Sequence, residues 1–243
     1  MKWIIGGTAE AREFVNMIKD SKDYILSVAT EAGVKFAGTK KLYVGRLSKY
    51  DMIDFIKENN INQIFDLSHP FAHIVSDNAK FAANETAIEY YRYKREETKL
   101  PEGGILAKDL DEALKIIGDL KGTILFTTGS KNIPDFQKVR GDNRFIFRVL
   151  PTSESMKICE ENNLELRDII AALGPFSRDF DKVLMTELKT DYCVMKDSGK
   201  GSGTFEKLEA CKQTKTVPII IMRRKEEGIS DLKEIYKIFM GEK

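Results

Sequence analysis

Residues 2–18, KWIIGGTAEAREFVNMI, hold the pattern that decides the fold. An apolar strand, expected at residues 2–5, ends at Gly6 and Gly7, and the segment after them places its apolar residues on one helical face. The glycines permit a tight turn, and the free N–H groups of the next helix attract an anion. The stretch therefore predicts an α/β unit whose first turn either binds an anion or is merely capped by Thr8.

The same alternation of short apolar runs and amphipathic segments continues along the chain. It implies helical crossovers between mostly parallel strands. Eleven expected strands are too many for one open sheet of ordinary size, which favours two sheets. These strands are expected at residues 2–5, 24–29, 41–44, 62–67, 88–93, 104–107, 122–127, 144–149, 166–171, 191–195 and 217–222.

A charged, apolar-poor segment, residues 96–104, ends in Pro101, Gly103 and Gly104 and is typical of a linker. We therefore expect one domain over residues 1–98 and a second over residues 99–243. The expected fold class is α/β, with mostly parallel sheets and a cleft between the domains. Ligands of such proteins bind beyond the carboxyl ends of the strands, so the loops that follow strands are the candidate sites.

Composition excludes several classes of protein. The 243 residues include 39 Lys and Arg against 38 Asp and Glu, a formal charge of +1, which argues against a nucleic-acid binder. No apolar run approaches the roughly 18 residues of a membrane span. Cys159, Cys193 and Cys211 are odd in number and lack a CxxC spacing, so neither disulfides nor a cysteine-based metal site is expected. A cytoplasmic protein without metal is the expectation, and the oligomeric state stays open.

The segment Asp66–Ala72 closes a buried strand and is expected to open a helix at Pro70. Ser68 or His69 would cap this helix, and Asp66 would orient the imidazole of His69. His69 is also a candidate for contact with a substrate. A metal site formed with His73 is disfavoured, because no HExxH pattern and no third ligand are evident.

Residues 89–95 contain Tyr90 and Lys94 at the YxxxK spacing of short-chain dehydrogenases. That chemistry needs a helix, whereas this segment has the alternation of a strand. Arg92 and Lys94 then share a side with Tyr90. This side is expected to be either a solvated strand face or an anion contact.

Three loops of the second half have the same character. Residues 127–131 offer hydroxyls, a glycine and a lysine after an apolar strand, and Gly174–Ser177 precedes a helix. Residues 196–204 contain three glycines, three hydroxyls and two lysines, which is the strongest anion-cradle pattern in the chain. The Walker A pattern is not satisfied, which disfavours hydrolysis of a nucleoside triphosphate.

Taken together and in order, these motifs resemble the precorrin-6A reductase family of corrin-ring (vitamin B12) biosynthesis, which includes the cobalt-precorrin-6A reductases. The resemblance spans almost the whole chain, with Ser68 where the family pattern has Thr. The motifs are Gly6-Gly7-Thr8-x-Glu10-Ala11-Arg12, Asp66-x-x-His69-Pro70-Phe71-Ala72, Tyr91-Arg92-x-x-Arg95, Thr127-Thr128-Gly129-Ser130-Lys131, Arg148-Val149-Leu150-Pro151, Gly174-Pro175-Phe176-Ser177 and Lys196-Asp197-Ser198-Gly199.

The resemblance implies two Rossmann-like domains, NADPH or NADH as cofactor, and a tetrapyrrole-derived macrocycle that accepts a hydride at a ring carbon. Since the macrocycle carries many carboxylates, its site needs several cations. The implied substrate-binding residues are Arg12, Ser68, Arg92, Arg95, Arg148, Ser177 and Lys196. The implied cofactor-binding residues are Gly6, Gly7, Thr8, Thr128, Gly129, Ser130, Lys131, Ser198 and Gly199.

His69 is the candidate catalytic residue, as the donor of the proton that accompanies the hydride. Bound water or the macrocycle's own N–H groups are alternatives for this role. Two other functions stay open from the sequence: a non-catalytic two-lobed protein that binds an anion, and an S-adenosylmethionine-dependent methyltransferase of the same pathway.

Overall fold

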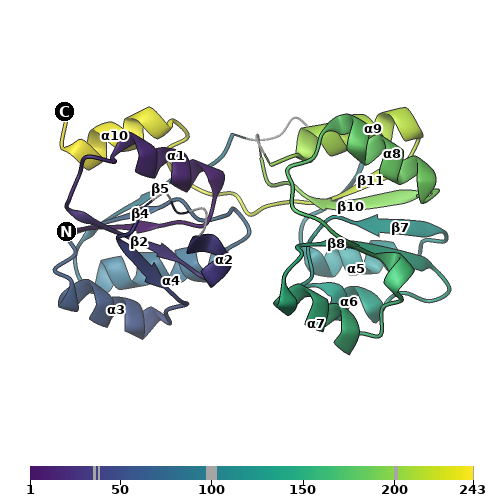
Figure 1. The fold of residues 1–243 in the computed structure, drawn as a ribbon, viewed down its shortest axis with the longest axis horizontal. Helices are drawn as coiled ribbons and strands as arrows, with labels where there is room; N and C mark the ends of the chain where they lie inside the picture. Colours follow the sequence, from purple (N-terminus) through teal and green to yellow (C-terminus); the bar gives the residue numbers. More distant parts are fainter. Residues whose placement is uncertain (35–36, 38, 97–102, 200–201, 243) are drawn as a thin grey trace. The chain divides into compact units, whose positions relative to one another are not determined.

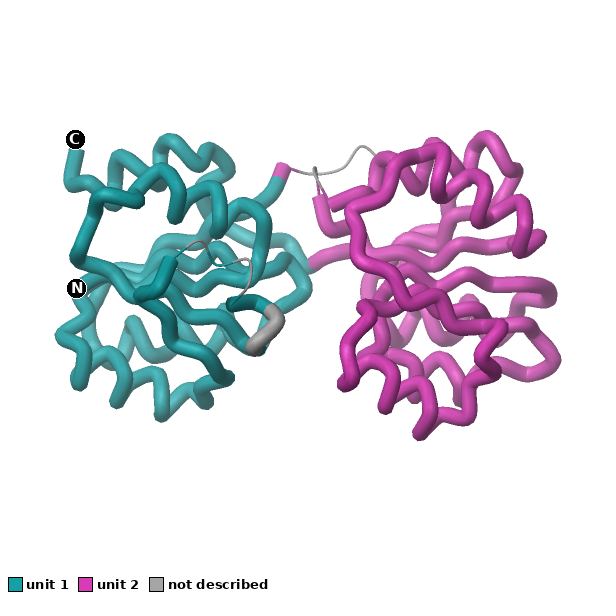
Figure 2. The backbone as a smooth tube through the Cα atoms, in the orientation of Figure 1, with its two compact units in different colours: residues 1–95, 224–243 teal, residues 96–223 magenta. Residues whose placement is uncertain are grey.

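The structure is a computed structural model that describes residues 1–34, 37, 39–96, 103–199 and 202–242. The chain forms two compact units (Figure 2): one contains Met1–Arg95 and Arg224–Lys243, and the other contains Glu96–Arg223. Each unit is built on its own parallel sheet with helices on both faces (Figure 1). The expected α/β fold class with two parallel sheets is confirmed.

The first unit holds a five-stranded sheet in the order β3-β2-β1-β4-β5. All of its strand pairs are parallel. Its elements are β1 (Lys2–Ile5), α1 (Ala9–Met17), β2 (Tyr24–Val28), α2 (Glu31–Val34), β3 (Leu42–Val44), α3 (Lys49–Glu58), β4 (Gln63–Asp66), α4 (His73–Glu85), β5 (Glu89–Arg92) and α10 (Leu232–Met240).

Alternating side chains of the strands build two cores, one on each face of this sheet. Ile4 of β1 points to the face that α1 and α10 cover, where it packs with Phe14 and Phe239. Trp3 and Ile5 point to the opposite face, which α3 and α4 cover. This is the period of two that a strand imposes, so a sheet buried on both faces needs nearly continuous apolar strands.

The second unit holds a six-stranded parallel sheet in the order β6-β11-β10-β7-β8-β9. Its core on one face includes Leu125, Ile146 and Cys193 under α8 and α9. Its elements are β6 (Ile105–Ala107), α5 (Leu110–Gly118), β7 (Thr123–Phe126), α6 (Ile133–Gln137), β8 (Arg144–Val149), α7 (Ser153–Glu161), β9 (Ile169–Ala171), α8 (Arg178–Glu187), β10 (Tyr192–Lys196), α9 (Thr204–Thr214) and β11 (Val217–Ile221).

All eleven expected strands are present among the described residues; most are one or two residues shorter than expected, and the largest difference is at β9. The strand expected at residues 166–171 starts at Ile169, because Leu166–Asp168 forms a 3-10 turn. Leu166 is exposed, whereas Asp168 is buried against Arg144, whose Nε lies 2.8 Å from its carboxylate. Leu166 and Asp168 therefore do not form the buried apolar face of a strand, although apolar and polar residues alternate here as they do in a strand.

The last segment of the chain differs from the domain division expected from the sequence. Residues 99–243 are expected to form the second domain, yet α10 packs on the first unit through Ile235 and Phe239. An amphipathic helix needs an apolar surface, but its own pattern does not say which core supplies that surface. Residues 97–102 of the expected linker lie outside the described residues. The expected interdomain cleft stays a prediction.

None of the described helices combines the length and the apolar composition that a membrane crossing requires.

Replacement of Phe239 by alanine should lower the free energy of unfolding of the first unit by about 3–5 kcal/mol. The ring is buried, and its centroid lies 5.4 Å from that of Phe14 and 5.2 Å from that of Phe65. The fluorescence of Trp3, the single tryptophan of the chain, reports urea unfolding of this unit. The matched control is Met240→Ala, because Met240 is 46% exposed, and it should change the free energy by less than about 0.5 kcal/mol. Equal effects of the two substitutions would contradict the placement of α10.

Candidate functional site

The strand order of the first sheet reverses between β1 and β4, and ligands of open α/β sheets bind at such a switch point. The loops that follow these two strands are joined directly. The Thr8 hydroxyl caps α1 by accepting a hydrogen bond from the Ala11 amide at 3.1 Å, and it donates to the Leu67 carbonyl at 2.8 Å. The loops after the first and the fourth strand, both singled out in the sequence, are therefore neighbours.

The two glycines after β1 have separate reasons to be glycine. A Cβ on Gly6 would lie 2.7 Å from Leu26 Cδ1, so the turn packs closely on β2. Gly7 has a φ of +100°, which favours glycine, and nothing lies within 4 Å of where its Cβ would be. The turn is thus open to a ligand on the side of Gly7.

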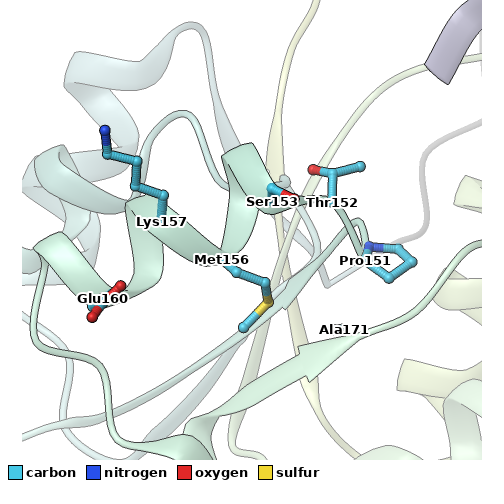
Figure 3. A pocket seen from close by; sticks show the side chains of 7 residues that line it. All are labelled: Pro151, Thr152, Ser153, Met156, Lys157, Glu160 and Ala171. Carbon is cyan, nitrogen blue, oxygen red and sulfur yellow. The ribbon is translucent and has the colours of Figure 1, made fainter. Parts of the chain in front are cut away.

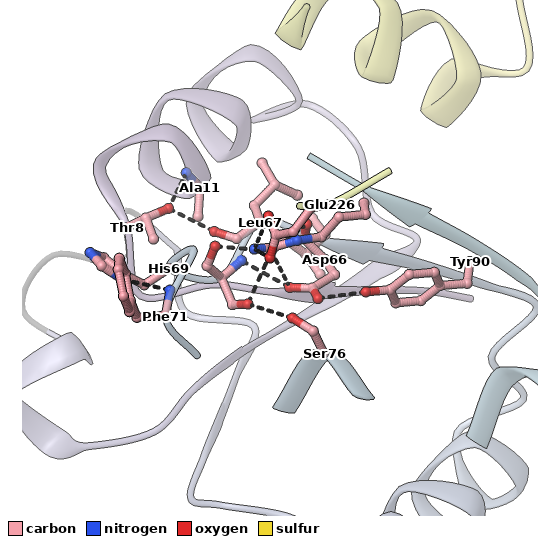
Figure 4. Close-up of polar contacts among 12 residues, drawn as sticks. Thr8, Ala11, Asp66, Leu67, His69, Phe71, Ser76, Tyr90 and Glu226 are labelled. Carbon is pink, nitrogen blue, oxygen red and sulfur yellow. Dashed lines mark hydrogen bonds and ion pairs between the residues drawn. The ribbon is translucent and has the colours of Figure 1, made fainter. Parts of the chain in front are cut away.

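A network of buried polar groups surrounds Asp66 at the end of β4 (Figure 4). Asp66 Oδ1 accepts from the Ser68 amide at 2.9 Å and from Arg92 Nη1 at 3.1 Å, and Oδ2 accepts from the Tyr90 hydroxyl at 2.7 Å. Arg92 Nη1 also donates to the Ser68 carbonyl and hydroxyl at 3.0 and 3.1 Å. Arg92 Nη2 donates to Glu226 at 3.1 Å.

The electrostatics of this network are dominated by the two carboxylates. Burial and the negative charge of Asp66 raise the pKa of Tyr90, so this phenol stays protonated. Burial lowers the pKa of Arg92, but the Asp66 and Glu226 carboxylates outweigh it and raise the pKa overall. Arg92 Nε is buried without a hydrogen-bond partner among the described residues.

The network corrects two expectations and leaves a third untested. Asp66 binds Ser68, Tyr90 and Arg92, so it does not serve to orient His69. The side of β5 that carries Tyr90 and Arg92 is largely buried, and it is not a solvated face. The side chain of Arg92 is only 6% exposed and its Nη atoms are hydrogen-bonded within the unit, so a role in binding substrate stays a prediction.

His69 lies in a turn that precedes α4, not in the helix. The Ala72 amide donates to the His69 carbonyl at 2.8 Å, and α4 starts only at His73, with Ala72 as a cap that makes no side-chain hydrogen bond. The expected cap by Ser68 or His69 is therefore wrong. His69 Nδ1 accepts from the Phe71 amide at 3.2 Å. No three ligand-type side chains of the described residues come together as a metal site.

The second sheet has its own switch point, between β7 and β10. The loops after these strands are again joined. Lys196 Nζ, at the end of β10, donates to the Thr128 carbonyl at 3.3 Å and to Asn132 Oδ1 at 3.2 Å. The Thr127 hydroxyl donates to the Val194 carbonyl at 3.1 Å. The sequence motifs at 127–131 and 196–199 therefore meet beyond the carboxyl ends of β7 and β10.

Several groups around this switch point suit an anion. Burial, and next the positive charge of Lys131, lower the pKa of Lys196. The Thr128 hydroxyl is buried and has no hydrogen-bond partner within the described part of the chain. Gly129 has a φ of +82°, with open space where a Cβ would be. Two cations, an unsatisfied hydroxyl and a bare backbone turn are the groups that an anion-binding site uses.

The loop after β10 is held by a buried ion pair between Asp197 and Arg223. Asp197 Oδ1 accepts from the Gly199 amide at 3.3 Å, and its Oδ2 lies 3.4 Å from Arg223 Nε. Ser198, which lies between Asp197 and Gly199 in the sequence, is buried. Lys200 and Gly201 of the predicted cradle lie outside the described residues.

The other predicted residues have varied surroundings. Arg148 forms an ion pair with buried Asp181 and lies 4.5 Å above the ring of Phe176. Ser177 caps α8 by accepting from the Phe180 amide at 3.2 Å. Arg12 is exposed on α1. Arg95 pairs with Glu10 at 2.7 Å, and the Ser130 hydroxyl donates to the Ser155 hydroxyl at 3.2 Å.

A pocket of the second unit lies beyond the ends of β8 and β9 (Figure 3). The Ser130–Ser155 hydrogen bond ties the start of α7, which forms one wall, to the loop after β7. The pocket is lined by Pro151, Thr152, Ser153, Met156, Lys157, Glu160 and Ala171. Of these residues, only Pro151 belongs to a motif identified in the sequence.

Sequence reasoning missed the partners of the predicted cations. Glu226, Asp181 and Asn132 each hold one of them, Asp197 holds Arg223, and Tyr90 completes the Asp66 network. Asn132 adjoins the motif at 127–131 and Asp197 belongs to the motif at 196–199, so their positions were a usable signal. Glu226 and Asp181 carry no such signal, because each reaches its partner through the topology of the sheet.

Comparison with known proteins identifies the family. The model of the family described as precorrin-6x reductase CbiJ/CobK matches residues 2–239. A cobalt-precorrin-6A reductase of Priestia megaterium is 36% identical over 231 residues, covering 92% of this chain and 91% of that protein. A cobalt-precorrin-6A reductase of Salmonella typhimurium is 32% identical, covering 91% of this chain and 86% of that protein.

The fold is also shared with a solved structure, that of CobK precorrin-6A reductase. The two chains superpose with a TM-score of 0.80 at 20% sequence identity, covering 99% of this chain and 96% of the other. The order of the sequence motifs and these similarities indicate the same family, and the two switch points fit its fold. The chain belongs to the precorrin-6x reductase CbiJ/CobK family, the oxidoreductases of cobalamin biosynthesis.

Proposed function

We propose that this protein reduces precorrin-6A, or its cobalt form, with NADPH or NADH as the hydride donor. Relatives named cobalt-precorrin-6A reductase support the substrate class. One structural observation carries the assignment of residues: at the switch point of the second unit, Lys196 and Lys131 flank a turn with an unsatisfied hydroxyl. Such a site binds a phosphate group with charge-assisted hydrogen bonds.

We place the pyrophosphate of the cofactor on the second unit for an electrostatic reason. Thr128, Gly129, Ser130 and Lys131, with Ser198 and Gly199 from the neighbouring loop, offer hydroxyls, backbone amides and cations. The turn at Gly6, Gly7 and Thr8 has the right backbone, but Glu10 in the first turn of α1 is a carboxylate that already binds Arg95. A carboxylate there competes with a phosphate for the same helix end.

A bound reduced nicotinamide would supply the hydride, and the protein supplies position and a proton. His69 is our candidate proton donor. Because Nδ1 accepts from the Phe71 amide, the proton of a neutral imidazole is assigned to Nε2, so His69 would donate through this atom. The Thr8–Leu67 hydrogen bond fixes the loop that carries His69.

The macrocycle needs both cations and an apolar surface. In the second unit, Phe176 and Phe180 stack with ring centroids 4.5 Å apart, and Leu173, earlier in the loop before α8, is 59% exposed. Aromatic faces of this kind suit a flat conjugated ring. We assign Arg148, which lies over Phe176, and the exposed Arg12 to carboxylates of the substrate.

The two alternatives from the sequence, a non-catalytic anion-binding protein and a methyltransferase, are disfavoured by the family match over residues 2–239. The direct test mixes the purified protein with precorrin-6A or cobalt-precorrin-6A and reduced cofactor, without oxygen. We expect loss of reduced-nicotinamide absorbance that depends on the macrocycle. Authentic substrate that leaves both NADPH and NADH untouched would refute the assignment.

The alkaline limb of the pH profile should depend on Lys196. A lysine with a lowered pKa loses its charge as the pH rises through that pKa. We therefore expect kcat/KM for the cofactor to fall at a lower pH than it would if Lys196 had the pKa of an ordinary lysine. Lys131→Gln removes the repulsion and should move this limb to higher pH. Lys138→Gln is the matched control, since Lys138 is 73% exposed and pairs with Asp135. A limb that stays in place in Lys131→Gln would argue against the coupling.

Thr128→Val separates binding from stability. Removing a buried hydroxyl that has no partner should leave the free energy of unfolding equal or higher, yet weaken cofactor affinity by about 1 kcal/mol, or roughly fivefold. Thr127→Val is the control: its hydroxyl donates to the Val194 carbonyl, so its loss should cost about 1 kcal/mol of stability and leave affinity unchanged. Calorimetric titration and urea unfolding measure both. Wild-type affinity in Thr128→Val would remove the hydroxyl from the site.

A further inference from the structure

Residues 223–226, the crossing segment, lead the chain from the second unit back into the first. We propose that this segment couples the two switch-point loops, with Arg223 and Glu226 as positioning residues for the reductase reaction. The coupling rests on the proposed function, because it links the proposed phosphate loop to the loop that carries His69. Both ends of the segment are fixed by ion pairs of low exposure.

The first anchor lies in the second unit. Arg223 Nε is 3.4 Å from Asp197 Oδ2, and the two side chains are 9% and 4% exposed. The other oxygen of Asp197 accepts from the Gly199 amide, so the same carboxylate shapes the phosphate loop. Arg223 Nη2 also donates to the Glu96 carbonyl at 2.9 Å, where the chain first enters this unit.

The second anchor lies in the first unit. Glu226 binds Arg92 at 3.1 Å, with side chains 16% and 6% exposed. Arg92 Nη1 binds the Ser68 carbonyl and hydroxyl, directly before His69. A shift of Glu226 therefore acts on the loop of the proposed proton donor through one guanidinium.

The crossing segment is short. Only Arg224 and Lys225 separate the anchors, and three residue steps span at most about 11 Å when fully extended. Beyond Glu226 the chain is pinned again: a Cβ on Gly228 would lie 2.4 Å from the Arg92 carbonyl oxygen, and the Ile229 amide donates to that oxygen at 2.9 Å. In this proposal, a displacement of one anchor is passed to the other through Arg224 and Lys225.

The chain's first crossing carries a similar device. Arg95, the last residue of the first unit before Glu96, pairs with Glu10 at 2.7 Å, with side chains 10% and 16% exposed. Glu10 belongs to the first turn of α1, directly after the Gly6–Thr8 turn. Both points at which the chain leaves or enters the first unit are thus tied by an arginine to one of its switch-point loops.

A merely structural ion pair would predict something different. Buried pairs often contribute little net stability, and breaking one costs stability whether or not it transmits anything. Independent structural pairs have additive effects, whereas parts of one mechanical link do not. The test must therefore measure the link and leave the pairs in place.

The decisive variant inserts Gly-Gly between Arg224 and Lys225, which keeps both ion pairs and lengthens the crossing segment. Hydrogen–deuterium exchange is followed at residues 196–199 and 67–72, with and without inorganic pyrophosphate as the probe. We expect pyrophosphate to slow exchange at 196–199 in both proteins, and at 67–72 in the wild type alone. Protection at 67–72 that survives the insertion, or is missing in the wild type, overturns the coupling. Absence of protection at 196–199 in the wild type instead counts against the proposed phosphate site.

A double-mutant cycle gives the kinetic counterpart, and it tests the coupling even if the phosphate binds elsewhere. Arg223→Gln and Glu226→Gln should each lower kcat/KM at least about fivefold, and the double variant should be no worse than the worse single variant. The control is Arg224→Gln, because Arg224 and its partner Asp77 are 68% and 70% exposed, and it should keep wild-type kinetics. Multiplicative losses in the double variant overturn the proposal. A variant that fails to fold is replaced by Arg223→Lys or Glu226→Asp in the same cycle.

Discussion

Asp66 is a carboxylate with no exposed surface, and the carboxyl ends of β4 and β5 are arranged around satisfying its hydrogen bonds and charge. A buried charge is tolerated when it is paired and hydrogen-bonded. Asp66 meets this condition through Ser68, Tyr90 and Arg92, which fixes a loop and the neighbouring edge strand in one arrangement. Arg92 in turn takes a second carboxylate from Glu226. The shape of the loop that carries the proposed proton donor follows from neutralising one charge.

The two units share a design but differ in local charge. In the first unit, two carboxylates surround one guanidinium and neutralise its charge. In the second unit, Lys196 and Lys131 repel each other beside the hydroxyl of Thr128, which has no partner among the described residues. The formal charge of +1 for the whole chain hides this difference. A network whose charges are paired suits a positioning role, and two neighbouring cations beside an unsatisfied hydroxyl suit a phosphate.

The strands and turns could be predicted from the sequence, because apolar runs and glycines act locally. Loops such as 6–8 and 127–131 were found because each follows a strand. The partners of the cations could not be predicted: Glu226 is 134 residues from Arg92, and only the strand order brings them together. For the same reason, the amphipathic pattern of α10 did not reveal that it covers the first sheet. Long-range pairing of charges depends on topology, which a local pattern does not contain.

The position of α10 has a consequence for how the chain is made. Residues 96–223 form a complete unit, whereas the first unit lacks one of its covering helices until residues 224–243 have been synthesised. Domains generally fold as the ribosome releases them, beginning at the N-terminus. Here the order is inverted: the middle of the chain can close its core first. Until residues 224–243 have left the ribosome, the nascent first sheet lacks the cover that Phe239 gives to Phe14 and Phe65.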